Sequence, residues 1–180
     1  MPDSCANPAR RAVLAGGAVA LALLLGCGKQ NGGESDYDKM ARAKQGVADS
    51  LASSGAKVQE KQYPVGKGWV VSLRGLTVTD DLLREVKQLG NIAELDLSKS
   101  TVTDEHLALM HELGLHALLA KLDLSNTAVT DAALQKLDGC IFLSELNLTG
   151  TKVTAAAVEQ FKKARQADER ARIKNTTVRR

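Results

Sequence analysis

Short stretches in which apolar and polar residues alternate recur along this chain of 180 residues, and apolar residues at helical spacing follow most of them. Each stretch holds two aliphatic residues separated by one residue, then a turn, and then a valine. These marker valines are Val78, Val102, Val129, Val153 and Val178. Their successive spacings are 24, 27, 24 and 25 residues. Self-similarity at such a period is typical of repeat proteins, so the pattern predicts stacked copies of one structural unit.

Each copy predicts a strand, a turn and a helix. Alternate side chains of a strand face the same side, so both leucines of a pair such as Leu122 and Leu124 are expected to point inward. Hydroxyl groups that follow the pairs can hydrogen-bond the turn backbone; they belong to Ser100, Thr127, Thr151 and Thr176. Threonines directly after the first four marker valines stand where helix N-caps belong, mostly followed by Asp: Thr79, Thr103, Thr130 and Thr154.

The helix of each copy is predicted from apolar residues that recur three apart. These inward residues are Leu83, Val86 and Leu89; Leu107, Met110 and Leu113; Leu134, Leu137 and Cys140; and Val158, Phe161 and Ala164. The copy with the 27-residue spacing is expected to place its extra residues around 111–117, on the return from the helix.

The central copies resemble the leucine-rich-repeat family. The segment Ile92-x-x-Leu95-x-Leu97-x-x-Ser100 follows the family's frame, and so do residues 119–127 and 143–151. The pair Gly139-Cys140 resembles the cysteine-containing subclass of that family. Terminal copies commonly depart from the frame; here Leu76 takes the polar position and Asp168 takes the first leucine.

This resemblance implies an α/β fold. The expected architecture is a leucine-rich-repeat solenoid with parallel strands on the concave face and helices on the convex face. It would cover residues 69–180 as four repeats and a partial fifth, which is residues 173–178.

Residues 36–68 are expected to form an N-terminal capping unit with a helix, because the end of a repeat stack has to be closed. Residues at helical spacing within it are Met40, Ala43, Val47 and Leu51, and Gly55 can end the helix. Residues 58–61 are predicted to form a strand that pairs with residues 69–73 across the loop 64–68.

Residues 1–26 are similar to a bacterial lipoprotein signal peptide. Arg10 and Arg11 precede an uncharged run, residues 12–25, which is short for a bilayer span of roughly 20 residues. The run ends in Leu24-Leu25-Gly26-Cys27, which resembles a lipobox and implies a lipid on Cys27 with cleavage before it. The alternatives are an uncleaved membrane anchor and a cleaved signal followed by a chance cysteine.

Residues 27–35 are polar and rich in glycine, which predicts a lipid-anchored flexible tether. The expected location is therefore the bacterial cell envelope, where the folded part would be anchored to a membrane and face away from the cytoplasm.

Composition narrows the classes of partner. The net charge is only +3, with acidic and basic residues interspersed, which argues against a nucleic-acid partner. A denser basic cluster near the C-terminus is expected to be solvated and to protect the sheet edge, with attraction to an anionic polymer or headgroup as the alternative. The cluster comprises Lys162, Lys163, Arg165, Arg170, Arg172, Lys174, Arg179 and Arg180.

Residues capable of catalysis or metal binding occur, but not at the spacing that either requires. His111 and His116 are five apart, which places them on different sides of a helix as solvated side chains. Cys140 falls at a core-facing position and is expected to be a buried thiol. Asp96 and Asp123 are expected to belong to an exposed polar ladder. We therefore predict no catalytic residue, metal site, cofactor or small-molecule substrate, and the chain is not expected to be an enzyme.

The expected function is non-catalytic protein–protein interaction, because the resemblance implies a protein partner, as yet unknown, on the concave sheet. The predicted binding residues are the outward strand positions and their neighbours: Ser72, Arg74, Glu94, Asp96, Lys121, Asp123, Glu145, Asn147 and Arg172. The alternative is a structural envelope lipoprotein that contacts an anionic cell-wall polymer or lipid headgroups through its basic C-terminus.

Overall fold

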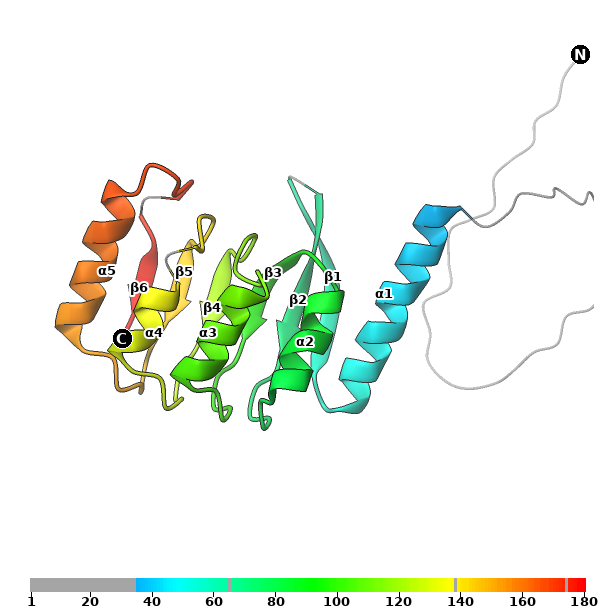
Figure 1. Cartoon of the computed structure of the whole chain (residues 1–180), viewed down its shortest axis with the longest axis horizontal. Helices are drawn as coiled ribbons and strands as arrows, with labels where there is room; N and C mark the ends of the chain where they lie inside the picture. The colour runs from blue at the N-terminus through cyan, green and yellow to red at the C-terminus, as the bar shows by residue number, and fades with distance from the viewer. Residues whose placement is uncertain (1–34, 65, 138, 174) are drawn as a thin grey trace, which may run out of the picture. The chain divides into compact units, whose positions relative to one another are not determined.

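Strands and helices alternate along the chain after an N-terminal helix and a hairpin (Figure 1). The computed structural model describes residues 35–180, apart from residues 65, 138 and 174. The predicted signal peptide, Cys27 and the rest of the predicted tether up to residue 34 lie outside the described residues. The elements are α1 (Asp36–Ser53), β1 (Lys57–Tyr63), β2 (Gly66–Ser72), α2 (Asp80–Gln88), β3 (Ile92–Asp96), α3 (Asp104–Glu112), β4 (Lys121–Asp123), α4 (Asp131–Lys136), β5 (Glu145–Asn147), α5 (Ala155–Ala167) and β6 (Thr177–Arg179).

The strands form one sheet in the order β1-β2-β3-β4-β5-β6. The hairpin strands β1 and β2 are antiparallel, and all later neighbours are parallel, so that Leu95, Leu122 and Leu146 stand side by side. Helices α2 to α5 lie next to one another on the same side of this sheet (Figure 1). The predicted α/β class with parallel strands is confirmed. The predicted hairpin is also confirmed, with strands longer than expected.

The aliphatic pairs of the central copies form the core as predicted. The strand leucines Leu122 and Leu124 expose 2% and 0% of their surface, and the equivalent pairs before and after them are buried as deeply. Three of the predicted turn hydroxyls donate to the carbonyl oxygen three residues before them. For Thr127 that bond, to the oxygen of Leu124, measures 2.6 Å, and Ser100 and Thr151 make the equivalent bonds. Each turn therefore satisfies its own buried carbonyl.

The four predicted threonine N-caps all precede their helices, and two of the Asp residues that follow them join neighbouring copies. Asp104 accepts hydrogen bonds from the backbone N–H of Thr130 at 2.9 Å and from its hydroxyl at 2.5 Å. Asp131 accepts the same pair from Thr154, at 2.6 and 2.9 Å. The fourth copy has Ala155 in place of Asp, and no α-helix follows α5 among the described residues. Asp104 and Asp131 thus each link the start of one helix to the start of the next.

The N-terminal helix α1 has the predicted position, but its apolar face is buried only at its C-terminal end. Ala48 and Leu51 are 5% and 0% exposed, whereas Met40 is 60% exposed. Ala43 is exposed as well. Met40 and Ala43, which share the helical spacing of Val47 and Leu51, therefore do not reach the core, and Met40 lines a hollow beside the hairpin instead. Gly55 follows the helix with φ of 93°, as expected of a glycine stop.

The partial fifth copy lies seven residues further along than predicted. Val178 pairs with Leu146 and therefore occupies the position of the first leucine of a strand pair. The alignment on marker valines predicts residue 171 at that position. Thr176 donates to the carbonyl oxygen of Leu143, in the preceding copy, at 2.7 Å instead of closing its own turn. The copy was misaligned mainly because α5 has 13 residues, whereas the helices of the earlier copies have 6 to 9, so the strand that follows it begins later.

Arg165 is buried, with 4% of its surface exposed, although its charge predicted a solvated side chain. Its Nη1 donates to the carbonyl oxygen of Cys140 at 2.9 Å, and its Nη2 donates to those of Leu143 and Ile173 at 3.3 and 3.1 Å. Ala164, which was predicted to face inward, is exposed. Helix α5 presents position 165 to the core because three carbonyl groups of two returning loops need donors there.

Candidate interaction surface

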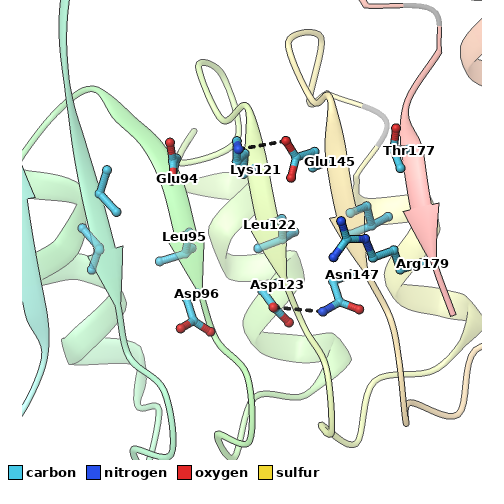
Figure 2. Close-up of a pocket in the computed structure, with 13 residues that line it drawn as sticks. Glu94, Leu95, Asp96, Lys121, Leu122, Asp123, Glu145, Asn147, Thr177 and Arg179 are labelled. Atoms are coloured by element: carbon cyan, nitrogen blue, oxygen red, sulfur yellow. Dashed lines mark hydrogen bonds and ion pairs between the residues drawn. The ribbon is translucent and has the colours of Figure 1, made fainter. Parts of the chain in front are cut away.

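Six of the predicted binding residues lie together on the sheet, on the side away from the helices (Figure 2). Glu94, Lys121 and Glu145 form one row across β3, β4 and β5, and Asp96, Asp123 and Asn147 form the next. We call these six residues the sheet face. They line a shallow hollow with a volume of about 250 Å³. The parallel register brings them together, because equivalent residues of successive copies become neighbours.

The first row of the sheet face is tied by ion pairs and a tyrosine. Lys121 Nζ lies 2.8 Å from Glu145 Oε1. Glu94 Oε1 accepts hydrogen bonds from Lys61 Nζ at 2.9 Å and from the Tyr63 hydroxyl at 2.8 Å. Burial raises the pKa of Glu94, but these bonds outweigh it and the pKa is lowered. Burial, and then the bond to Glu94, raise the pKa of Tyr63 to about 12. The carboxylate is thus held as an acceptor and the phenol as a donor.

The second row is a ladder in which each side chain also caps a turn. Asn147 Nδ2 donates to Asp123 Oδ2 at 3.0 Å, and the Ser72 hydroxyl donates to Asp96 Oδ2 at 2.9 Å. The other carboxylate oxygen of each Asp accepts the backbone N–H two residues on, at 2.9 Å from Ser98 and 2.8 Å from Ser125. Burial raises the pKa of Asp123, but its hydrogen bonds outweigh that effect and the pKa is lowered. Both Asp side chains are half-buried, more enclosed than predicted.

Arg172 is not part of the sheet, which corrects its assignment to the binding surface. It is exposed in the segment before β6, where its backbone N–H donates to the carbonyl oxygen of Ile141 at 2.9 Å. Arg179 instead stands beside Asn147 and lines the hollow (Figure 2). Of the other predicted residues, Ser72 extends the second row on β2. Arg74 is exposed just after that strand, and its charge contributes to the lowered pKa of Asp123.

Sequence reasoning missed four polar side chains of this surface: Lys61, Tyr63, Thr177 and Arg179. The pattern predicts the hairpin only as part of a cap, with a first strand that ends at residue 61; in the longer β1, alternation places Lys61 and Tyr63 on one side of the strand. Arg179 was missed through the shift in the last copy. With these residues included, the surface carries fixed donors and acceptors of both signs. Such an array suits the recognition of a polar, partly charged partner.

His111 and His116 stack on each other, with ring centroids 4.5 Å apart and planes inclined by 8°. The prediction that they point to different sides was wrong because α3 ends at Glu112 and Gly114, with φ of 69°, turns the chain back. His116 lies so close to Gly139 that a Cβ atom there would meet its Nε2. The described residues contain no group of three or more His, Cys, Asp or Glu side chains able to hold a metal ion. Cys140 is fully buried, as predicted.

The stacked histidines predict a loss of stability in mild acid. Burial, and then the charge of His111, lower the pKa of His116 from its usual 6.5. The folded chain therefore binds this proton less readily than the unfolded chain. The stability contributed by neutral His116 is complete above pH 6.5 and is lost as the pH falls through the lowered pKa. In urea unfolding at pH 7.5 and at pH 5, we expect the wild type to lose more free energy of unfolding than His116→Gln. Equal losses would contradict the prediction.

Neither a protein-family model nor a curated protein matches the chain. In the part of the chain that the structure describes, no helix is both long and apolar enough to cross a bilayer. The predicted lipidation site, Cys27, lies outside the described residues.

Proposed function

We propose that residues 69–180 form a short leucine-rich-repeat solenoid that binds a protein partner through the sheet face, without catalysis. The observation that carries the proposal is the register of β3, β4 and β5, which gathers the polar residues of successive copies on one surface. That surface is preorganised, because most of its charged groups already hold their hydrogen bonds. Little side-chain freedom would then be lost on binding.

The proposal includes a tether to a membrane through a lipid on Cys27. Two or more acyl chains anchor a protein stably, since each buried methylene contributes about 0.8 kcal/mol. We further propose that the sheet face acts at the membrane of the cell envelope, facing away from the cytoplasm. Support for this part comes only from residues 1–27 of the sequence.

Two features favour the sheet face over the basic C-terminus as the binding surface. Arg165 is used inside the fold, which removes one member of the predicted basic cluster. Arg170 forms an ion pair with Asp168, with Nε 3.1 Å from the carboxylate. The cluster therefore offers an anionic wall polymer less free charge than the sequence suggested.

Site-specific photocrosslinking in the cells that make the protein tests the binding surface. A photoreactive amino acid at Glu145, whose side chain is 50% exposed, is expected to capture one defined protein. The same protein should be captured from Lys121 on the neighbouring strand. The matched control is Gln135, exposed on α4 on the opposite side of the sheet. Equal capture of that protein from Gln135, or none from either strand position, would refute the assignment.

Fractionation of the same cells tests the tether separately. Cys27→Ser is expected to move the chain from the membrane fraction to the soluble fraction or to block its processing. Intact mass of the wild type should exceed that of residues 27–180 by the mass of the acyl groups. A wild type that is soluble and unacylated would remove the membrane part of the proposal and leave the binding part in place.

A further inference from the structure

An apolar groove runs along the ends at which the parallel strands begin, beside the sheet face. It has a volume of about 450 Å³. Small residues form its floor, namely Gly68, Ala93 and Ala120, and larger side chains form its walls. We call it the rim groove, and the described residues that line it are Tyr63, Pro64, Gly66, Lys67, Gly68, Asn91, Ala93, Leu118, Ala120, Phe142 and Ile173.

The rim groove is preformed. Its Tyr63 wall is held in place by the 2.8 Å hydrogen bond from the phenol to Glu94, and Lys61 Nζ lies 5.4 Å from the centre of the ring. On the floor, a Cβ atom added to Gly68 would lie only 2.9 Å from the Cβ of Ala93. The backbone there is closed by the bond from Ala120 N–H to the Ala93 carbonyl oxygen at 2.8 Å. A ligand would therefore find the groove open without rearrangement.

Leu118 shows that the apolar surface of the groove faces solvent. Its side chain is 46% exposed, and among the described residues only Tyr37 and Met40, both on α1, are large hydrophobic residues of comparable exposure. Exposed apolar surface collected in a concave site is typical of a binding site. The residues come from five separate parts of the chain, so the groove is a product of the fold and not of one loop.

Two polar features indicate what the groove accepts. Lys67 is the one charged side chain that lines it in the described part of the chain. Its Nζ lies 2.7 Å from Glu60 on the hairpin. Both side chains are exposed, so a carboxylate of a partner could share the Lys67 ammonium group with Glu60. Asn91 is exposed, and its backbone carbonyl oxygen accepts from the Trp69 N–H at 2.7 Å, which fixes its position at the edge of the groove. Its carboxamide can both donate to and accept from a peptide group.

The span of the groove fits a short extended segment. Neighbouring strands lie about 4.8 Å apart, so the distance from β2 to β5 is about 15 Å, the length of four or five extended residues. Such a segment presents two or three side chains to the same side. A second copy of the chain would need to bury about 800 Å² per partner for a stable dimer, more than a segment of this length provides.

We propose that the rim groove binds an extended segment of a partner protein, which inserts two or three apolar side chains and places an acidic side chain near Lys67. This inference rests on the proposed function and names a second contact surface for its partner. The polar sheet face and the apolar groove would then act together, one for orientation and the other for affinity.

Selection of random dodecapeptides displayed on phage, with the full-length chain as target, tests the inference. Enriched peptides are expected to hold two or three apolar residues in alternation with an acidic residue beside them. Synthetic fluorescent copies of these peptides are then titrated with the protein. Leu118→Gln is expected to weaken binding about tenfold, since loss of one buried leucine contact is worth that much. Lys67→Gln should weaken it severalfold.

The matched control is Met40→Gln, which also replaces an exposed apolar side chain by an amide and should leave peptide affinity unchanged. Loss of affinity in Met40→Gln equal to that in Leu118→Gln would overturn the proposal. Peptides that lose affinity for Asp123→Asn but bind Leu118→Gln as tightly as the wild type would also overturn the proposal, although the proposed function would then survive. Dimerisation abolished by Leu118→Gln would assign the groove to a second copy instead. Absence of any enriched peptide, together with absence of crosslinks from the sheet face, would overturn both proposals.

Discussion

Replacing Arg165 by Met is expected to destabilise the chain by about 3 kcal/mol, although arginine is normally a surface residue. The guanidinium supplies hydrogen bonds to three carbonyl groups, those of Cys140, Leu143 and Ile173. Methionine fills similar space but donates nothing, and each carbonyl left unsatisfied costs on the order of 1 kcal/mol. The guanidinium also lies 5.6 Å from the ring of Phe161, and this cation–π contact would be lost as well.

Urea unfolding at neutral pH measures this effect, with Lys163→Met as the control. Lys163 is exposed on the same helix, so its loss should change the free energy of unfolding by less than about 0.5 kcal/mol. Hydrogen exchange should show where the damage begins. In Arg165→Met, the amides of residues 168–180 should lose protection first, because the segment before β6 is held through the Ile173 carbonyl. Equal midpoints for the two variants would show that Arg165 does not hold this end of the fold.

The sequence predicted the parts of the fold that repeat. Leu97 and Leu124 recur at equivalent positions of successive copies, and Thr103 and Thr130 mark equivalent helix starts. Each copy is built by short-range rules, namely alternation in strands and capping in helices. Because the same residues recur in several copies, the same strand or helix start is predicted independently in each copy. The two rows of the sheet face followed from this regularity, because neighbours in a parallel sheet are equivalent residues of adjacent copies.

The parts that could not be predicted depend on contacts between copies. Arg165 faces inward because of carbonyl groups in two other segments, and no local rule for helices reports these. The place of Arg172 was taken by Arg179 because α5 is longer than the earlier helices, and its length is not a repeated feature. His116 reaches His111 through a turn that only the longer second repeat has. The rim groove depends on residues as far apart as Tyr63 and Ile173, which only the folded chain brings together.

Two leucines of the same chain, Leu124 and Leu118, are expected to separate stability from binding. Leu124 is fully buried in the third copy, between the equivalent leucines of the second and fourth copies, whereas Leu118 is 46% exposed on the rim groove. Leu124→Ala should lower the free energy of unfolding by about 3 to 4 kcal/mol, since it removes buried methyl groups and leaves a cavity in a layer that both neighbouring copies share. Leu118→Ala should cost less than about 1 kcal/mol.

Thermal unfolding measures the stability of the two variants, and peptide titration measures their binding, so the two methods together separate these effects. Leu124→Ala is expected to lower Tm by about 10 °C and, at a temperature where it is folded, to bind the selected peptides as the wild type does. Leu118→Ala should keep the wild-type Tm and lose peptide affinity. Because stacked copies stabilise one another only through nearest neighbours, Leu124→Ala should also reduce hydrogen-exchange protection in β3 and β5 and much less in the hairpin. Uniform loss of protection over all six strands would show a single cooperative core in place of stacked layers.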